Sequence, residues 1–220
     1  VRSIHYSDGY INDLELINHL PSTAELAFGL MCDLMRHITN SNNIVHSTKE
    51  WDYTKFVGNQ IKGSNIGILG FGRLGKMMYK FCKAFDANLF VYDPYLDDSR
   101  INCASISELF MKSDIISIHV HVTDETKGIV NHELLEKKIK YLINTSRGEI
   151  INESDVITAL KNKKLFGYAT DVLESEFDDI KKSEFFLPEN KKLNLILTPH
   201  VGGMTIEGQT KAYLWSINKL

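Results

Sequence analysis

The chain has 220 residues, of which 43% are hydrophobic, and its formal net charge at pH 7 is −3. A chain of this length can bury one substantial core, and length alone allows one or two domains. Its lysines are scattered and form no basic stripe, so the composition predicts no nucleic-acid partner. No apolar stretch approaches the roughly 18 residues that a membrane span needs, and no signal-peptide pattern opens the chain, so no membrane partner is predicted either.

The three cysteines, Cys32, Cys82 and Cys103, are far apart and lack the paired spacing of a metal or redox motif. We therefore predict no bound metal and a reducing, cytoplasmic compartment. Residues 1–20 resemble a strand already under way followed by a loop, which indicates a fragment.

Residues 22–38 carry the apolar spacing of an amphipathic helix. Pro21 and a capping box formed by Ser22 and Glu25 predict where the helix begins. Apolar residues then recur at spacings of three and four: Ala24, Ala27, Leu30, Met31, Leu34, Met35 and Ile38.

Residues 40–62 are rich in Asn, Ser and Thr, and this composition predicts an extended connector. The connector nevertheless carries Trp51, Tyr53 and Phe56, which need a surface on which to pack. That surface could belong to a neighbouring subunit or to the core of the chain itself, and the sequence leaves both alternatives open.

After the connector, short apolar runs alternate with helical patterns. The predicted strands are 66–69, 89–92, 115–119, 141–144, 166–170 and 195–197. The predicted helices are 73–86, 105–112, 131–138 and 153–162. This alternation predicts an α/β fold, a Rossmann-type doubly wound parallel sheet covered on both faces.

A glycine motif, Gly70-Phe71-Gly72-Arg73-Leu74-Gly75, joins the first of these strands to a helix. Gly70 permits a tight turn, Gly72 lets the backbone approach a phosphate, and Gly75 lets the helix lie close to the sheet. Arg73 and Leu74 stand where backbone amides at a helix start would face a diphosphate. The motif in this context predicts a dinucleotide site.

Asp93 ends the second predicted strand, about 20 residues after the glycine motif. A carboxylate at this place accepts hydrogen bonds from the adenosine ribose, and its charge repels a 2′-phosphate. The predicted cofactor is therefore NAD rather than NADP.

Polar residues follow the carboxyl ends of most of the other strands: His119 and His121, then 144–147, then Asp171, then His200. In an open parallel sheet these ends share one edge, where ligands bind. Several separate segments are therefore expected to converge on one cleft.

Three of these polar residues are candidates for chemistry. Arg147 could grip a carboxylate through two parallel hydrogen bonds, or form a surface ion pair. His200 could exchange a proton near neutral pH, or have a structural role. Glu176 could pair with a histidine and raise its pKa, or be merely solvated.

Taken together, these blocks resemble the NAD-binding half of the D-isomer-specific 2-hydroxyacid dehydrogenases, the family of D-lactate, glycerate, phosphoglycerate and formate dehydrogenases. The resemblance runs from about Pro21 to Gln209. Besides the glycine motif, it rests on Ser-Thr-Ala-Glu (22–25), Tyr-Asp-Pro (92–94), Asp-Glu-Thr-Lys-Gly (124–128), Ile-Asn-Thr-Ser-Arg-Gly (143–148), Ala-Thr-Asp-Val-Leu-Glu-Ser-Glu (169–176) and Thr-Pro-His-Val-Gly-Gly (198–203).

The resemblance implies hydride transfer between nicotinamide and C2 of a D-2-hydroxy acid or its 2-keto acid. Arg147 would bind the carboxylate and keto oxygen of the substrate, His200 would donate and accept the proton, and Glu176 would hold His200. The implied cofactor contacts from the other strand ends are Val120, His121, Thr126, Thr145, Ser146, Asp171 and Gly203.

The chain departs from the family pattern at three places. His121 and Phe177 each stand where the family usually has a proline, and the long step from Glu176 to His200 predicts an enlarged loop. Formate dehydrogenases carry glutamine at the position of Glu176, which argues against that activity.

The family also has a longer N-terminal part that forms most of a flavodoxin-like substrate domain. The implied division is a remnant of that domain (1–20), the NAD-binding domain with its linking helix and dimerisation connector (21–204), and a helix returning to the substrate domain (205–220). The fragment alone is expected to bind NAD but to turn over substrate poorly.

The resemblance further implies a homodimer through the helix that starts at Ser22 and the aromatic connector. A different class remains open, in which the fold is an NAD(H)-sensing binding module such as a corepressor. The presence of Arg147, Glu176 and His200 favours the enzyme, because a pure sensor does not need all three.

Overall fold

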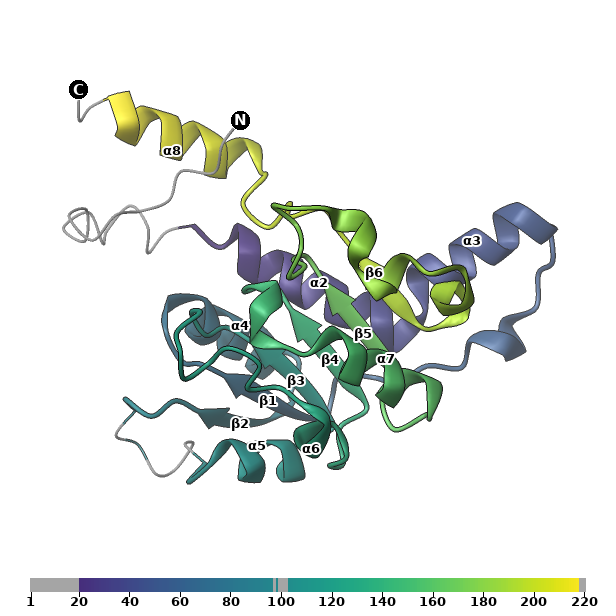
Figure 1. The fold of residues 1–220 in the computed structure, drawn as a ribbon, viewed down its shortest axis with the longest axis horizontal. Helices are drawn as coiled ribbons and strands as arrows, with labels where there is room; N and C mark the ends of the chain where they lie inside the picture. Colours follow the sequence, from purple (N-terminus) through teal and green to yellow (C-terminus); the bar gives the residue numbers. More distant parts are fainter. Residues whose placement is uncertain (1–19, 97, 99–102, 218–220) are drawn as a thin grey trace.

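The computed structural model describes residues 20–96, 98 and 103–217, which are built around one six-stranded parallel sheet (Figure 1). The strand order is β2-β1-β3-β4-β5-β6. The strands are β1 (Asn65–Leu69), β2 (Asn88–Tyr92), β3 (Ile115–Ile118), β4 (Tyr141–Asn144), β5 (Gly167–Thr170) and β6 (Leu195–Leu197). All six predicted strands are confirmed, and each predicted end lies within one residue of the observed end.

Helices cover both faces of the sheet and enclose two apolar cores. On one face are α2 (Ser22–Arg36) and α4 (Arg73–Ala84), and on the other are α5 (Ile106–Lys112), α6 (His132–Leu135) and α7 (Glu153–Lys161). The predicted doubly wound sheet is therefore confirmed. Only α6 is much shorter than expected. After it, the chain turns toward the start of β4, where the N–H groups of Lys140 and Tyr141 donate to Asp114 O.

The predicted capping box at the start of α2 is wrong. Pro21 occupies the cap position, no side chain caps the helix, and Ser22 is already helical. The Ser22 hydroxyl instead lies 2.8 Å from Thr205 Oγ1, 183 residues away in sequence. A long-range contact has taken the place of the local one.

The extended connector is also wrong in its first half, which forms α3 (Ile38–Thr48), followed by the single turn η2 (Tyr53–Phe56). His37, with φ 55°, ends α2 in the left-handed region. The Asp33 carboxylate then accepts from Thr39 N at 2.7 Å and from Thr39 Oγ1 at 2.5 Å, which satisfies donors at the start of α3. Because α3 buries none of its residues, its sequence has no apolar stripe that could have indicated a helix.

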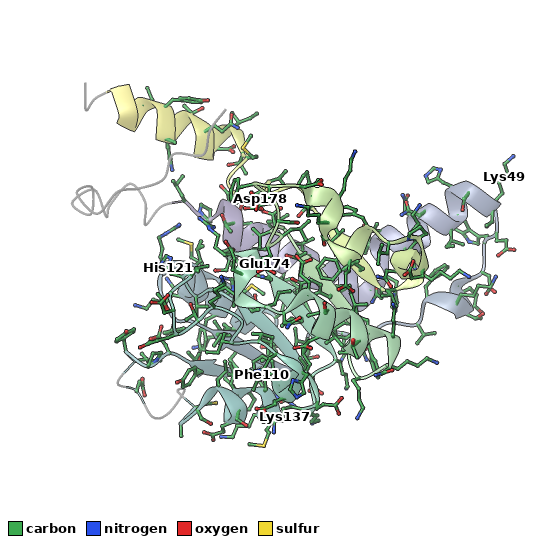
Figure 2. All side chains as sticks on the ribbon, in the orientation of Figure 1. Lys49, Phe110, His121, Lys137, Glu174 and Asp178 are labelled. Carbon is green, nitrogen blue, oxygen red and sulfur yellow. The ribbon has the colours of Figure 1, made fainter. Side chains whose placement is uncertain are left out.

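This segment projects away from the sheet as an arm, which we define as residues 38–57 (Figure 1). Lys49 marks its far end in Figure 2. Trp51 and Tyr53 are 87% and 85% exposed. The core of the chain therefore does not cover these two aromatic rings.

Three single turns, η4 (Ile180–Lys182), η5 (Glu184–Phe186) and η6 (Pro188–Lys192), fill the segment between Glu176 and β6. The segment that the sequence analysis expected to be an enlarged loop is thus a series of short turns without a strand or a longer helix. Beyond β6, α8 (Ile206–Ile217) forms the expected last helix and extends away from the sheet in Figure 1. The predicted remnant strand lies outside the described residues.

Candidate functional site

The turn after β1 uses its three glycines differently. Gly70 has φ +93°, and a Cβ there would lie 2.8 Å from His119 O. A Cβ on Gly75 would collide with the carbonyl oxygen of Gly70, so α4 packs backbone to backbone on the turn. A Cβ on Gly72 would meet no atom within 4 Å. The fold therefore needs Gly70 and Gly75, whereas Gly72 borders open space.

That open space belongs to a cavity of about 720 Å³ at the carboxyl ends of β1, β2 and β3. Its walls include Gly70, Gly72 and Asp93, together with Val120 and His121 from the loop after β3. This is the point where the strand order reverses direction around β1, the place where open α/β sheets bind nucleotides.

Asp93 is fixed at the mouth of the glycine turn. Its Oδ2 accepts from Phe71 N at 2.7 Å, and its Oδ1 accepts from Tyr95 N at 2.9 Å. These bonds hold the carboxylate beside the cavity and tie the end of β2 to the turn after β1. The sequence argument predicted the position of Asp93 but not its bond to the turn.

The loop after β3 is held from both of its ends. Thr126 Oγ1 donates to His121 O at 2.6 Å, and the Ser146 hydroxyl donates to Val120 O. Hydrogen bonds thus join the loop after β3, which carries Val120 and Thr126, to Ser146 in the loop after β4. His121 itself is exposed at the rim of the cavity.

The residues present fit a dinucleotide. Gly72 leaves the turn open where a diphosphate would approach its amides, and Asp93 stands one strand away. Thr145, at the end of β4, has a buried Oγ1 with no hydrogen-bond partner among the described contacts. A buried hydroxyl without a partner is costly, and a ligand that bonds to it would remove that cost.

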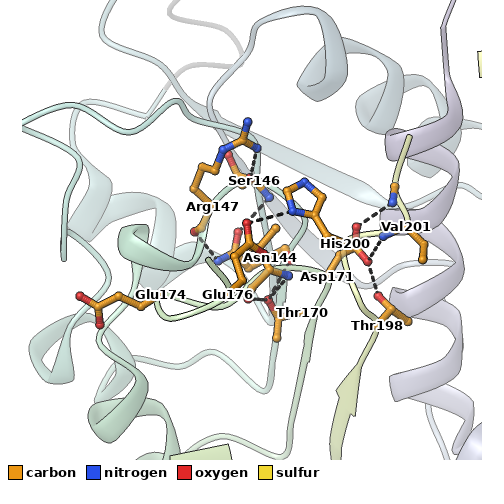
Figure 3. A network of polar contacts seen from close by, with 12 residues as sticks. Asn144, Ser146, Arg147, Thr170, Asp171, Glu174, Glu176, Thr198, His200 and Val201 are labelled. Carbon is orange, nitrogen blue, oxygen red and sulfur yellow. Dashed lines mark hydrogen bonds and ion pairs between the residues drawn. The ribbon is translucent and has the colours of Figure 1, made fainter. Parts of the chain in front are cut away.

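His200 sits on a loop that Asp171 holds in place (Figure 3). Asp171 is 1% exposed, and its carboxylate accepts from Thr198 Oγ1 at 2.5 Å, Val201 N at 2.8 Å and Gly202 N at 2.7 Å. His200 has φ 53°, an unfavourable left-handed conformation for a residue other than glycine. The Asp171 side chain thus holds three atoms of the loop around His200.

The imidazole of His200 pairs with Glu176, which is the contact that the family resemblance implied. Its Nδ1 lies 2.9 Å from Glu176 Oε1. The hydrogen bond to Glu176 raises the pKa of His200 above its ordinary value, while burial and the charge of Arg147 act in the opposite direction. The pair leaves Nε2 as the ring nitrogen that can meet a substrate.

Arg147 lies near this pair, as Figure 3 shows, and its charge acts on the His200 pKa. Its guanidinium is exposed and Nη1 donates to Ser146 O at 2.6 Å, with no carboxylate partner among the described residues. The surface ion pair considered from sequence is therefore not formed. Asn144 braces the segment: its Nδ2 donates to Arg147 O at 2.9 Å, and its Oδ1 accepts from Ser146 N at 3.0 Å.

The surroundings of three other predicted residues, Gly203, Leu74 and Arg73, differ from one another. Gly203 is exposed, with open space around a hypothetical Cβ. Leu74 lies in the first turn of α4, and Arg73 Nη1 donates to Leu20 O at 2.5 Å. For Arg73 the described side-chain contact is thus to the backbone before α2.

Sequence reasoning missed the bracing roles of Asn144 and Thr198, and the interior position of His119. The ring of His119 bonds to Ser117 Oγ at 2.9 Å, while its Nδ1 is buried without a partner. Burial lowers the pKa of His119 to about 4. In the sequence, the one feature that could have indicated these residues is their place at the ends of predicted strands.

A glycine turn opening on a cavity, an acid after the neighbouring strand and an imidazole–carboxylate pair at the same sheet edge place the chain in the class of dinucleotide-binding dehydrogenase domains. Comparison with known proteins narrows the class. Residues 28–202 match the family described as D-isomer specific 2-hydroxyacid dehydrogenase, NAD binding domain, and the chain belongs to that family. Its cofactor is NAD.

Two curated relatives show the range of names in the family. The chain is 38% identical over 199 residues to the D-3-phosphoglycerate dehydrogenase of Bacillus subtilis, covering 86% of the chain and 36% of that protein. It is 32% identical over 206 residues to the hydroxypyruvate reductase of Thermotoga maritima, covering 91% of the chain and 65% of that protein. The chain thus spans only about a third to two thirds of these relatives.

A solved structure agrees with the fold. The Salmonella D-lactate dehydrogenase superposes with a TM-score of 0.77 at 27% identity, over 89% of this chain and 65% of that one. Among the helices that the structure describes, none combines the length and the apolar character needed to cross a bilayer.

Proposed function

We propose that the protein is an NAD-dependent oxidoreductase that interconverts a D-2-hydroxy acid and its 2-keto acid. The observation that supports this most is the His200–Glu176 pair near Arg147, at the same sheet edge as the cavity beside the glycine turn. A binding module needs the cavity alone. An enzyme also needs a proton donor and an anchor for the substrate.

Each of the three residues has a separate role in the proposal. Arg147 holds the substrate carboxylate and polarises the keto oxygen through its planar guanidinium. His200 Nε2 donates a proton to the keto oxygen during reduction and accepts the hydroxyl proton during oxidation. Glu176 keeps the ring oriented and favours its charged form, which is the form that reduction requires. NADH, when bound, supplies the hydride.

The cofactor residues predicted from sequence belong to this proposal. The turn of Gly70, Gly72, Arg73, Leu74 and Gly75 would hold the diphosphate, and Asp93 the adenosine ribose. The nicotinamide and its ribose would lie along the remaining predicted contacts: Val120, His121, Thr126, Thr145, Ser146, Asp171 and Gly203.

The test separates proton transfer from cofactor binding. In the full-length protein, His200→Ala should abolish turnover of 2-keto acids while NADH affinity, measured by calorimetry, stays within about twofold. His132→Ala, at an exposed histidine at the start of α6, is the matched control and should change neither quantity. A large loss of NADH binding in His200→Ala would show that the residue is structural.

The same experiment decides between the enzyme and the NAD(H)-sensing module. Tight NADH binding by the parent protein, with no turnover on a broad panel of 2-keto acids, would favour the module. Absence of NADH binding would exclude both.

We also propose a homodimer in which a second copy covers the arm. Trp51, Tyr53 and Val57 are each more than 80% exposed on it, and exposed apolar groups of this size mark interaction surfaces. Tyr53→Glu should yield a monomer by light scattering, whereas Met111→Glu, at an exposed apolar residue of α5, should not. A monomeric parent protein would contradict this part of the proposal.

The domain division and the compartment also stay proposals. The described part of the chain fits 21–204 as the cofactor domain, with α8 leaving it at residue 206. Cys32, Cys82 and Cys103 are all free, as a reducing cytoplasm would leave them.

A further inference from the structure

The loop between Glu176 and β6 borders an apolar cavity of about 330 Å³ beside the His200–Glu176 pair. Its apolar walls are Leu173, Phe177, Ile180, Phe186, Leu197 and Pro199. Both members of the pair line it as well, and the Phe177 ring lies 6.4 Å from the ring of His200. The cavity therefore shares a wall with the proposed proton donor.

The wall of this cavity holds more acidic than basic side chains. Among the described residues, no lysine or arginine lines the cavity, and its two acids are Glu176 and Asp171. Both carboxylates are already engaged, one with His200 and the other with the loop that carries His200. A phosphate or a second carboxylate in this space would meet two anions, and His200, the one lining group that can carry a positive charge, is already paired with Glu176, so an anion is unfavourable there. Lys182, on the same loop, lines a different cavity.

The loop is anchored, so the cavity is preformed. Phe185 is buried against Tyr168 of β5, with ring centroids 5.5 Å apart. Ser183 Oγ donates to Glu153 Oε2 at 2.6 Å, and Asn190 Nδ2 donates to Glu184 O at 2.8 Å. These contacts fix η5 and η6 to the body of the domain.

The cavity also has an apolar rim that faces solvent. Phe177, Ile180 and Phe186 are 69%, 43% and 45% exposed. Apolar surface in water is unfavourable, and a ligand group that covers it contributes affinity in proportion to the area buried. A preformed pocket with such walls selects apolar groups.

We propose that this cavity receives the C3 substituent of the 2-keto acid, and that this substituent is a branched aliphatic or an aromatic group. The inference rests on the proposed function, because it needs C2 of the substrate at His200 and its carboxylate at Arg147. C3 is one bond from C2. A substituent on C3 can therefore reach the cavity wall to which His200 belongs. A volume of about 330 Å³ suits one side chain rather than a cofactor.

The first experiment compares substrates with the full-length protein and NADH. The value of kcat/KM for 4-methyl-2-oxopentanoate and for phenylpyruvate should exceed that for glyoxylate and for 3-phosphohydroxypyruvate by at least about tenfold. If glyoxylate or 3-phosphohydroxypyruvate is turned over as well or better, this inference fails and the proposed function stands. If no 2-keto acid is turned over, both fail.

Loop variants test whether the cavity causes the preference. Phe186→Ala should lower kcat/KM for 4-methyl-2-oxopentanoate by about tenfold or more. The value of kcat/KM for glyoxylate should stay within about twofold of that of the parent protein. Leu187→Ala is the matched control, because Leu187 is the next residue, is also exposed and does not line the cavity. Equal effects on both substrates, or equal effects of both variants, would overturn the assignment.

A binding measurement gives a readout without turnover. NADH and D-2-hydroxy-4-methylpentanoate are both reduced, so together they bind but cannot react. Calorimetry should show that Ile180→Asp weakens the binding of this hydroxy acid by about tenfold or more relative to the binding of glycolate. The reason is that the substitution adds a third carboxylate to the apolar wall. An unchanged ratio of the two dissociation constants would place the substituent elsewhere.

Discussion

Replacing Gly72 and Gly75 by alanine should separate what the fold needs from what the cofactor needs. A Cβ on Gly75 would lie 3.1 Å from the carbonyl carbon of Gly70 and closer still to its oxygen. Both groups are backbone, so α4 must move from the turn, and overpacking of this kind costs about 1–3 kcal/mol. Alanine recovers up to about 1 kcal/mol of helix propensity. With the full gain in propensity, we expect a net loss of up to about 2 kcal/mol in the free energy of unfolding.

Gly72 should behave in the opposite way. Its backbone, at φ −70° and ψ −160°, is open to any residue, and no atom lies within 4 Å of the added methyl group. Stability should therefore stay unchanged or rise by up to about 1 kcal/mol, because alanine restricts the unfolded chain. The methyl group would, however, stand between the turn and a diphosphate. Loss of one charge-assisted hydrogen bond, about 1.5–3 kcal/mol, corresponds to roughly a tenfold to hundredfold weaker binding of NADH.

Urea unfolding and calorimetry with NADH measure the two effects on the same preparations. Gly29→Ala is the control, because Gly29 lies within α2 and has no atom near a hypothetical Cβ. It should raise stability slightly and leave NADH affinity unchanged. The reasoning would be refuted if Gly72→Ala bound NADH like the parent protein, or if it lost more stability than Gly75→Ala.

Three further predictions concern titratable groups. Glu176→Gln removes the anion that raises the pKa of His200, so the rate of keto-acid reduction should fall at a lower pH than in the parent protein; an unshifted pH–rate profile would exclude this role. Because burial lowers the pKa of His119 from 6.5 to about 4, folding stability should decline as pH falls through that window, by at most about 3 kcal/mol. Urea unfolding of His119→Gln should show a smaller decline, and an equal decline would mean that other groups cause it. Asp93→Asn keeps an acceptor for Phe71 N but removes the charge, so the ratio of NADP to NAD dissociation constants should fall about tenfold; an unaltered ratio would show that another group selects the ribose.

The sheet could be predicted from sequence because its signals are local. Each strand is a short apolar run between turn residues, and burial on both faces makes such runs continuous. The glycine motif also specifies its own turn, since Gly70 and Gly75 are required by atoms of the same turn and its neighbouring strand end.

The arm could not be predicted in this way. Residues of α3 bury nothing, so the helix depends on a left-handed residue and the Asp33 carboxylate rather than on an apolar stripe.

The candidate site was predictable only in part, for a related reason. Residue type singled out Arg147 and His200, and the rule about strand ends placed them at one edge. The bracing by Asn144 and Asp171 depends on which backbone amides face the carboxyl ends of β4 and β5 after folding. That arrangement is set by the register of neighbouring strands, which a single sequence does not display.

The strain at His200 shows why those unforeseen contacts matter most. A left-handed histidine costs free energy, and such a conformation persists only where its surroundings over-determine it. Here the surroundings are Asp171, which binds the residues on both sides of His200, and Glu176, which binds its ring. The same backbone turn places the imidazole near Arg147, and His200 also lines the apolar cavity. One buried carboxylate thus fixes the position of the imidazole beside this cavity.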